Sequence, residues 1–168
     1  MTLEQKVLAK NDLTAERNRG WLAGRGVLAL NVMSSPGSGK TTLLERTIAD
    51  IGGQRRVSVV EGDQETMLDA NRIKATGCAV VQVNTGEKSR VVVISVTEGT
   101  DKPLKYPHMF AAANLVIVNK ADLLPYVDFD VDLCTKYARS VNPDLQMITL
   151  SATTGQGIAQ WYDWIAKQ

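Results

Sequence analysis

The chain has 168 residues, 44% of them hydrophobic and 22% charged, and its formal net charge is +1. This length and apolar content predict a single domain, residues 1–168, with a substantial core. The balanced charge argues against a nucleic-acid partner, which usually requires a strongly basic face. No apolar run approaches the roughly 18 residues of a membrane helix, and the first six residues are too polar for a secretory signal. We therefore expect a cytoplasmic protein without a membrane partner.

The N-terminal residues carry a helical pattern, with Leu3, Val7, Leu8 and Leu13 among many charged residues. This pattern predicts a helix over about residues 1–20. We favour a helix that covers one edge of a sheet, and a partner-binding helix is the alternative.

Residues 34–42 read Ser-Ser-Pro-Gly-Ser-Gly-Lys-Thr-Thr, after the apolar run 27–33 and before a helical pattern. Strand, glycine-rich turn, Gly-Lys-Thr and helix together are the context of a phosphate-binding loop. The glycines let backbone N–H groups point at a phosphate, and the start of the helix adds its positive dipole end. We predict that Lys40 neutralises the β- and γ-phosphates and that Thr41 ligates Mg²⁺.

The loop departs from the usual motif at one position, because Ser34 stands where the first glycine is expected. A glycine- and serine-rich turn that binds no phosphate is therefore the alternative. Gly37, Gly39, Lys40 and Thr41 keep their relative spacing after a predicted strand, which favours the phosphate loop.

Strands and helices alternate along the rest of the chain. Strands are predicted at 57–61, 79–83, 91–96, 115–118 and 146–150, and helices near 65–75, 104–113, 130–140 and 157–167. Strands that are almost continuously Val, Ile and Leu predict an α/β fold, with a mostly parallel sheet and helices on both faces. Ligands of such folds bind at the carboxyl ends of the strands. The phosphate loop, Asp63, Asn119 and Ser151 all fall at those ends.

Asn119-Lys120-Ala121-Asp122 follows the fifth predicted strand. Asn-Lys-x-Asp at this place is the guanine-reading motif of GTPases, because the Asp122 carboxylate can accept from both N1–H and the exocyclic amine of guanine. Adenine offers no such donor pair and would leave the carboxylate unpaired. Lys120 would lie along the ring, and Asn119 would tie this loop to the phosphate loop. A polar turn is the alternative.

Two weaker signals complete the predicted site. Ser151 and Ala152 follow the last predicted strand and resemble a Ser-Ala-Lys motif in which a backbone N–H meets guanine O6, with Thr153 in place of the lysine. Asp63 is a candidate to hold Mg²⁺ through water or to orient the attacking water, and a helix N-cap is its alternative.

The predicted catalytic residues are Lys40, Thr41 and Asp63, of which Thr41 and Asp63 would hold Mg²⁺. The residues predicted to bind GTP or GDP are Gly37, Ser38, Gly39, Lys40, Thr41, Thr42, Asn119, Lys120, Asp122, Ser151 and Ala152.

Longer blocks of the sequence are more specific than these motifs. They are Ser-Ser-Pro-Gly-Ser-Gly-Lys-Thr-Thr-Leu-Leu, Val-Glu-Gly-Asp, Val-Asn-Thr-Gly (83–86), Ser-Val-Thr-Glu-Gly-Thr-Asp-Lys-Pro-Leu-Lys-Tyr-Pro (95–107), Asn-Lys-Ala-Asp-Leu-Leu-Pro-Tyr and Leu-Ser-Ala-Thr-Thr-Gly. In these blocks, which cover nearly the whole chain, the sequence resembles the hydrogenase nickel-incorporation GTPases of the HypB family.

The resemblance implies a P-loop GTPase of the signal-recognition and metallochaperone type, related to the urease accessory GTPase. It implies slow hydrolysis of GTP to GDP and phosphate with Mg²⁺, and a nucleotide-dependent homodimer. It also implies nickel insertion during maturation of [NiFe]-hydrogenase. A HypA-type nickel chaperone and the hydrogenase precursor would be the partners, and nickel or zinc would be bound.

One part of the family pattern is missing. In the family, Asn-Thr-Gly is followed by a Cys-His metal-binding segment and later by a Glu/Asp-x-x-Gly element that senses the γ-phosphate, whereas here Gly86 runs straight into Glu87. Only residues 84–90 join two predicted strands, and a parallel crossover needs a dozen or more residues. Either these strands form an antiparallel hairpin, or a segment between Gly86 and Glu87 is absent. We favour the second.

Without that segment we name no nickel or zinc ligand in this chain. Cys78 and Cys134 are far apart in the sequence, so we expect two core thiols and no disulfide framework. His108, the only histidine, is expected to be a packed or surface residue.

The main functional hypothesis is a GTPase coupled to nickel insertion. A guanine-nucleotide module that cannot hydrolyse GTP, because the γ-phosphate sensor is missing, is one alternative. An accessory GTPase for another nickel enzyme, such as urease, is a second. A P-loop kinase or ATPase is a third, and it would prefer adenine.

Overall fold

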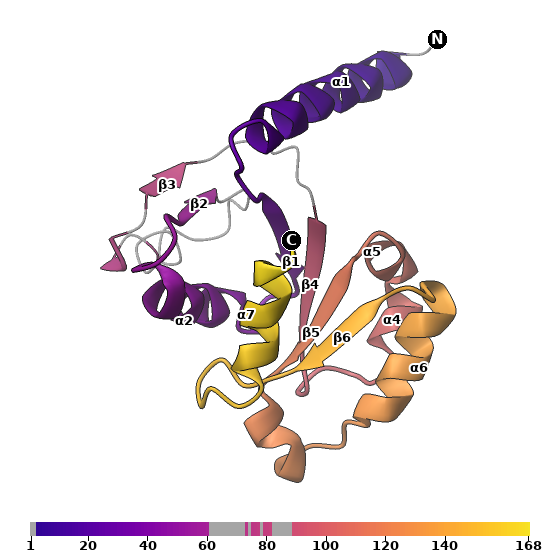
Figure 1. Cartoon of the computed structure of the whole chain (residues 1–168). Coiled ribbons are helices and arrows are strands. Elements are labelled where there is room, and N and C mark those ends of the chain that lie inside the picture. Colours follow the sequence, from indigo (N-terminus) through magenta and orange to yellow (C-terminus); the bar gives the residue numbers. More distant parts are fainter. Residues whose placement is uncertain (1–2, 61–72, 74, 78, 82–88) are drawn as a thin grey trace.

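The computed structural model describes residues 3–60, 73, 75–77, 79–81 and 89–168 (Figure 1). Its strands are β1 (Leu30–Ser34), β2 (Ser58–Val60), β3 (Ala79–Val81), β4 (Ser89–Ser95), β5 (Leu115–Asn119) and β6 (Gln146–Thr149). Its helices are α1 (Leu3–Ala23), α2 (Lys40–Ile51), α4 (Lys102–Lys105), α5 (Pro107–Ala111), α6 (Val131–Val141), α7 (Ile158–Ala166) and the 3₁₀ helix η1 (Ala121–Tyr126). Most of the helix predicted near 65–75 lies outside the described residues.

Four strands form one parallel sheet in the order β1-β4-β5-β6, and β2 and β3 form a separate parallel pair. Since neighbouring strands run in the same direction, their carboxyl ends meet at one edge of the sheet. Ser34 of β1, Ser95 of β4 and Asn119 of β5 end their strands at this edge. The mostly parallel sheet that the sequence predicts is confirmed.

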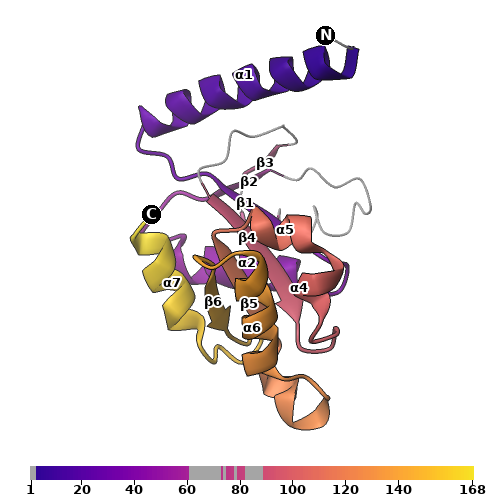
Figure 2. The same cartoon turned by 90° about the vertical axis from the view of Figure 1, so that its right-hand side faces the viewer.

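Alternate residues of β4 pack into two hydrophobic layers. Val91 and Val93 belong to a cluster with residues of α2 and α7, whereas Val92 and Ile94 belong to a cluster with residues of α5 and α6. All four valine and isoleucine side chains are fully buried. Figures 1 and 2 show α2 and α7 on one side of the sheet and α4, α5 and α6 on the other, so the prediction of helices on both faces is confirmed.

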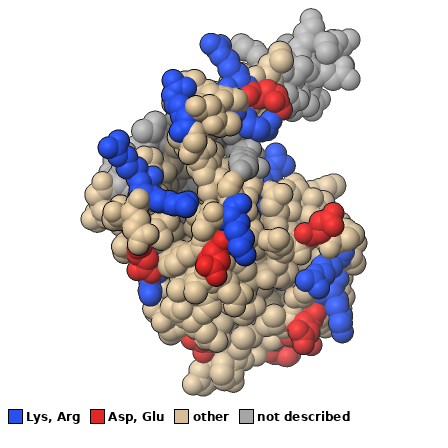
Figure 3. All heavy atoms as spheres, in the orientation of Figure 1, with Lys and Arg blue, Asp and Glu red and all other residues tan. Residues whose placement is uncertain are grey.

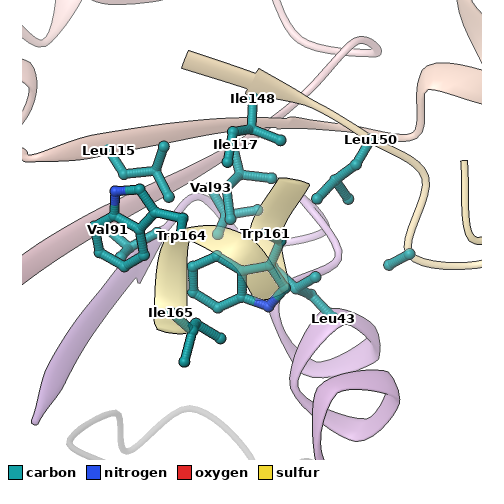
Figure 4. Close-up of a cluster of buried hydrophobic side chains, with 11 residues drawn as sticks. Leu43, Val91, Val93, Leu115, Ile117, Ile148, Leu150, Trp161, Trp164 and Ile165 are labelled. Carbon is teal, nitrogen blue, oxygen red and sulfur yellow. The ribbon is translucent and has the colours of Figure 1, made fainter. Parts of the chain in front are cut away.

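The layer formed by α2 and α7 contains two tryptophans (Figure 4). The rings of Trp161 and Trp164 stack with centroids 5.6 Å apart. The Trp161 indole N–H donates a buried hydrogen bond of 2.9 Å to Oγ1 of Thr47 in α2. At the surface, the Tyr162 hydroxyl donates to Asp50 at 2.6 Å and thereby helps to lower the pKa of that carboxyl group. These contacts fix α7 against the helix that begins after the predicted phosphate loop.

Between residues 79 and 113, one expectation from the sequence and one alternative that we did not favour are wrong. The helix predicted near 104–113 is two short helices, because Tyr106 has φ −127° and ψ 54°. A residue before a proline is disfavoured in the α region, and Pro107 follows directly. The antiparallel hairpin considered for the third and fourth strands is also wrong, since β3 pairs in parallel with β2, and β4 with β1 and β5.

The N-terminal helix α1 extends away from the four-stranded sheet in both views (Figures 1 and 2). Our expectation that this helix covers one edge of the sheet is therefore wrong. Near its C-terminal end, Leu22 lines a cavity together with Ile165 of α7, while Trp21 is 56% exposed. No helix in the described part of the chain is both long enough and apolar enough to span a bilayer. On the face shown in Figure 3, positive and negative side chains are interspersed.

The buried hydrogen bond of Trp161 gives a test of the core. Trp161→Phe removes the indole N–H and leaves a small cavity, so we expect it to lower the free energy of unfolding by about 2 kcal/mol. Trp21→Phe, the same change at an exposed ring, should alter it by less than about 0.5 kcal/mol. Urea denaturation followed by circular dichroism measures both, and equal effects would contradict the packing described for α2 and α7.

Candidate functional site

The predicted phosphate loop lies between the last residue of β1, Ser34, and the first residue of α2, Lys40. Gly37 and Gly39 have φ angles of 75° and 92°, in the left-handed region. A Cβ atom on Gly39 would lie 2.4 Å from Nδ2 of Asn119, so the chain passes closer to that side chain than any other residue would allow. Glycine is therefore required at position 39 by both conformation and space.

Ser34, the departure from the usual motif, has a simple structural explanation. It is the last strand residue of β1 and pairs with Val93 of β4. Extended backbone of this kind is accessible to every residue. A serine is therefore compatible with the backbone of the loop at this position.

The Asn119 side chain joins two loops to the end of β5. Its Nδ2 donates to the Ser38 carbonyl at 2.9 Å, and its Oδ1 accepts from the Ala152 N–H at 3.0 Å. Asn119, Ser38 and Ala152 are all buried, with exposures of 2%, 1% and 4%. The Asn119 amide thus provides a hydrogen-bond partner for the Ser38 carbonyl and for the Ala152 N–H, where water is largely excluded. The link between Asn119 and the phosphate loop that the sequence predicts is present.

Lys120 is the one non-glycine residue with a positive φ among the described residues, with φ 62° and ψ 37°. This conformation costs about 1 kcal/mol for a residue with a Cβ atom. The Ala121 N–H donates to the Leu150 carbonyl at 3.1 Å, which holds the turn against the end of β6. Asp122 then lies in the first turn of η1 and is partly exposed. The turn therefore keeps the Asp122 carboxylate accessible beside buried neighbours.

The loop after β6 is organised around Ser151, which is fully buried. Its hydroxyl accepts from the Thr154 N–H at 3.1 Å, and its carbonyl accepts from the Gly155 N–H at 2.9 Å. The Ala152 N–H donates to Oδ1 of Asn119, so it is not the N–H of this loop that remains open to a base. Ser151 thus shapes the loop, and Ala152 connects it to Asn119.

The start of α2 has the properties of an anion site. No side chain caps its N-terminus, and its first turn contains no acidic residue. Thr41, Thr42 and Lys40 lie there, partly buried, and the buried Ser38 hydroxyl has no hydrogen-bond partner among the described residues. Unsatisfied N–H groups and the helix dipole favour a phosphate at such a terminus. Asp63, the other predicted catalytic residue, lies outside the described residues.

Two charged residues of this edge, Lys102 and Glu98, are not among the residues predicted from the motifs. Nζ of Lys102 donates to the Ser35 hydroxyl at 2.6 Å and forms an ion pair with Glu98. Both charged residues belong to the block at 95–107, which is the signal that could have found them. Its spacing alone does not indicate that Lys102 contacts the phosphate loop.

Two of the three cysteine and histidine residues considered as metal ligands lie in the described part of the chain. Cys134 is fully buried in α6, as expected for a core thiol, and burial raises its pKa to about 11. His108 is exposed on α5. No group of three or more His, Cys, Asp or Glu side chains that could hold a metal occurs among the described residues. Cys78 lies outside them.

Asn119→Ala tests the central amide. It leaves the buried Ser38 carbonyl and Ala152 N–H without partners, so we expect a loss of about 2–4 kcal/mol in the free energy of unfolding. Asn114→Ala is the matched control, because Asn114 is exposed and accepts one hydrogen bond from the Arg90 N–H. It should cost less than about 1 kcal/mol in the same urea titration, and a reversed order would contradict the role given to Asn119.

The chain was compared with known proteins. A family model described as the nucleotide-binding domain of CobW, HypB and UreG matches residues 28–88 and 87–149. The hydrogenase maturation factor HypB of Escherichia coli K12 is 45% identical over 210 aligned positions, which cover 100% of this chain and 72% of that protein. The crystal structure of HypB from Archaeoglobus fulgidus has a TM-score of 0.85 at 30% identity, covering 95% of this chain and 98% of that one. HypB from Helicobacter pylori, in complex with nickel, has the same TM-score at 28% identity, covering 94% of each chain.

The alignments also bear on the segment expected after Gly86. The 210 positions shared with the E. coli protein are 42 more than the 168 residues of this chain, so at least that many have no residue here. The family match is interrupted where its first stretch ends at residue 88 and its second begins at residue 87. Residues 82–88 lie outside the described part of the structure. The family match thus agrees with the absence of a segment at this junction, and the length of the alignment shows that residues are absent within the aligned region.

The family model matches more than half of the chain, the identity to a HypB protein is 45%, and solved HypB structures share the fold. The chain therefore belongs to the HypB family of hydrogenase maturation factors, with the nucleotide-binding domain of the CobW, HypB and UreG proteins.

Proposed function

We propose that this chain binds guanine nucleotides and hydrolyses GTP to GDP and phosphate, in support of nickel insertion into hydrogenase. The single observation that carries the proposal is the Asn119 amide, which bonds both the Ser38 carbonyl and the Ala152 N–H. Through it, the predicted phosphate loop and the predicted base-reading loops are joined at the carboxyl edge of the sheet. A nucleotide spans both kinds of element.

Guanine selectivity would come from Asp122. Its carboxylate accepts hydrogen bonds from the N1–H and the exocyclic amine of guanine, whereas adenine cannot supply both donors. The strained backbone of Lys120 supports this assignment, since unusual conformations of this kind concentrate at functional sites. The Lys120 stem would lie along the base, and the loop that Ser151 and Ala152 organise would border it on the other side.

Hydrolysis would take place at the start of α2. The N–H groups from Gly37 to Thr42 bind the phosphate oxygens, and Lys40 neutralises the charge that develops on them. The Thr41 hydroxyl is an oxygen ligand of the kind that Mg²⁺ prefers, and Asp63 would complete the set through water. Bound Mg²⁺ supplies further neutralisation of the phosphate charge. The residues of the loop hold the nucleotide in line for attack by water.

The biological setting is proposed from the family. The chain would act in the cytoplasm as a nucleotide-dependent homodimer, with a HypA-type chaperone and the hydrogenase precursor as partners. Nickel would be the cargo, and we assign no residue of this chain as a ligand of nickel or zinc. An accessory role for another nickel enzyme, such as urease, is the alternative within the same chemistry.

A second candidate is a guanine-nucleotide module that binds without hydrolysis. The observation that favours it is the missing segment, because the relatives have at least 42 residues more within the aligned region. In the resembling family, the γ-phosphate sensor follows the Cys-His segment that is absent here.

Single-turnover hydrolysis distinguishes the two candidates. With protein in excess over GTP and Mg²⁺ present, we expect slow release of inorganic phosphate, measured by the conversion of labelled GTP to GDP. Lys40→Ala should abolish it, because the terminal phosphates lose their cation. Tight binding of GTP without conversion would instead establish the binding module.

Asp122→Asn tests the base assignment. The amide presents a donor where the carboxylate presented an acceptor, so affinity for GDP should fall at least about a hundredfold. Affinity for xanthosine diphosphate should rise, because xanthine offers an acceptor in place of the exocyclic amine. Asp128→Asn, a change at an exposed aspartate, is the control and should leave both affinities unchanged in isothermal titration. A P-loop ATPase would bind ADP in preference to either nucleotide.

A further inference from the structure

Lys102 lies close to the phosphate loop although it follows a different strand. It is the first residue of α4, which comes after β4, and its Nζ donates to the Ser35 hydroxyl at 2.6 Å. Ser35 follows the end of β1, and β1 is the sheet neighbour of β4. The contact therefore crosses the carboxyl edge of the sheet from one strand to the next.

The ion pair between Lys102 and Glu98 is nearly buried, with side chains 14% and 15% exposed. The same spacing recurs one turn later between Lys105 and Asp101, whose side chains are 60% and 48% exposed. Removing two charges from water is costly and is weak evidence for stability. The exposed pair of Lys105 and Asp101 contributes little to stability, but its charges stay in water and it has no desolvation cost. The stability of α4 therefore does not explain why the nearly buried pair of Lys102 and Glu98 is present.

Glu98 is itself fixed, because its other carboxylate oxygen accepts from the Ser95 N–H at 3.1 Å. The ammonium of Lys102 is thus held from one side by the end of β4 and rests on the phosphate loop from the other. The Ser35 carbonyl accepts from the Ser38 N–H at 3.3 Å, which closes the first turn of the loop. Ser35 therefore links a fixed cation to the backbone that would surround a phosphate.

We propose that Lys102 is a positioning residue for the terminal phosphate. It fixes the start of the loop through Ser35 and neutralises the Glu98 carboxylate beside the loop. GTP carries one more phosphate charge than GDP, so an unpaired Glu98 carboxylate would repel GTP more than GDP, and its pairing with Lys102 favours GTP. This inference rests on the proposed guanine-nucleotide function and adds to it a source of GTP preference that does not depend on the absent segment.

The test compares affinities for GDP and for a non-hydrolysable GTP analogue, measured by isothermal titration with Mg²⁺ on the full chain. Lys102→Met keeps the length of the side chain and removes its charge. We expect it to weaken the GTP analogue by about tenfold or more and GDP by clearly less. Lys102→Arg keeps the charge and should restore most of the preference. Lys105→Met, which removes the charge of the exposed pair, should change neither affinity by more than about twofold.

A double-mutant cycle tests whether the effect passes through Ser35. Ser35→Ala removes the hydroxyl and should itself lower the preference for the GTP analogue. Adding Lys102→Met to that variant should then cost less than it does in the wild type. If Lys102→Met does not fold, Ser35→Ala and Lys102→Arg give the answer, since an unchanged preference in Ser35→Ala contradicts the proposal.

The possible results separate this inference from the function on which it rests. A wild-type chain that binds no guanine nucleotide overturns the proposed function. A wild-type chain that binds both nucleotides, with Lys102→Met weakening them equally or not at all, overturns the role of Lys102 alone. An effect of Lys105→Met as large as that of Lys102→Met would also overturn it, because any positive charge on α4 would then suffice.

Discussion

The candidate site depends on one buried amide. Asn119 is a single side chain with one donor group and one acceptor, and both are used, on the Ser38 carbonyl and the Ala152 N–H. The close approach also explains the glycine at position 39, where a Cβ atom would collide with the same Nδ2. Three segments separated by many residues in the sequence are in this way held in one arrangement.

The parallel sheet brings these three segments to the same edge, where Asn119 can join them. Buried Val and Ile residues in β4 and β5 fill both faces, and helices pack on them from both sides. Each strand ends at that edge with a polar segment. The loop after β1, the segment after β4, and the turns after β5 and β6 therefore meet there. The family model that matches the chain is described as a nucleotide-binding domain.

Much of this could be predicted from the sequence, because it depends on local pattern. The apolar runs at 91–96 and 115–118 predict buried strands. The apolar run before Gly37, Gly39 and Lys40 predicts a strand, a glycine-rich turn and a helix, and the structure has all three in that order. Contacts between distant segments were harder to foresee. Nothing in the spacing of residues 95–107 indicates that Lys102 reaches Ser35, and the donation of the Ala152 N–H to Asn119 depends on how two loops meet. The break at Tyr106 had a local signal, Pro107, which the helical pattern outweighed.

The central claim is that this edge of the sheet binds a guanine nucleotide, and competition between GDP and ADP tests it most directly. The purified chain, freed of bound nucleotide, would be titrated with each in the presence of Mg²⁺. The account predicts saturable binding of GDP at one site, with ADP weaker by at least about a hundredfold, as expected where a carboxylate acceptor selects the donor pair of guanine. Equal affinity for the two nucleotides, or binding of neither, would contradict it.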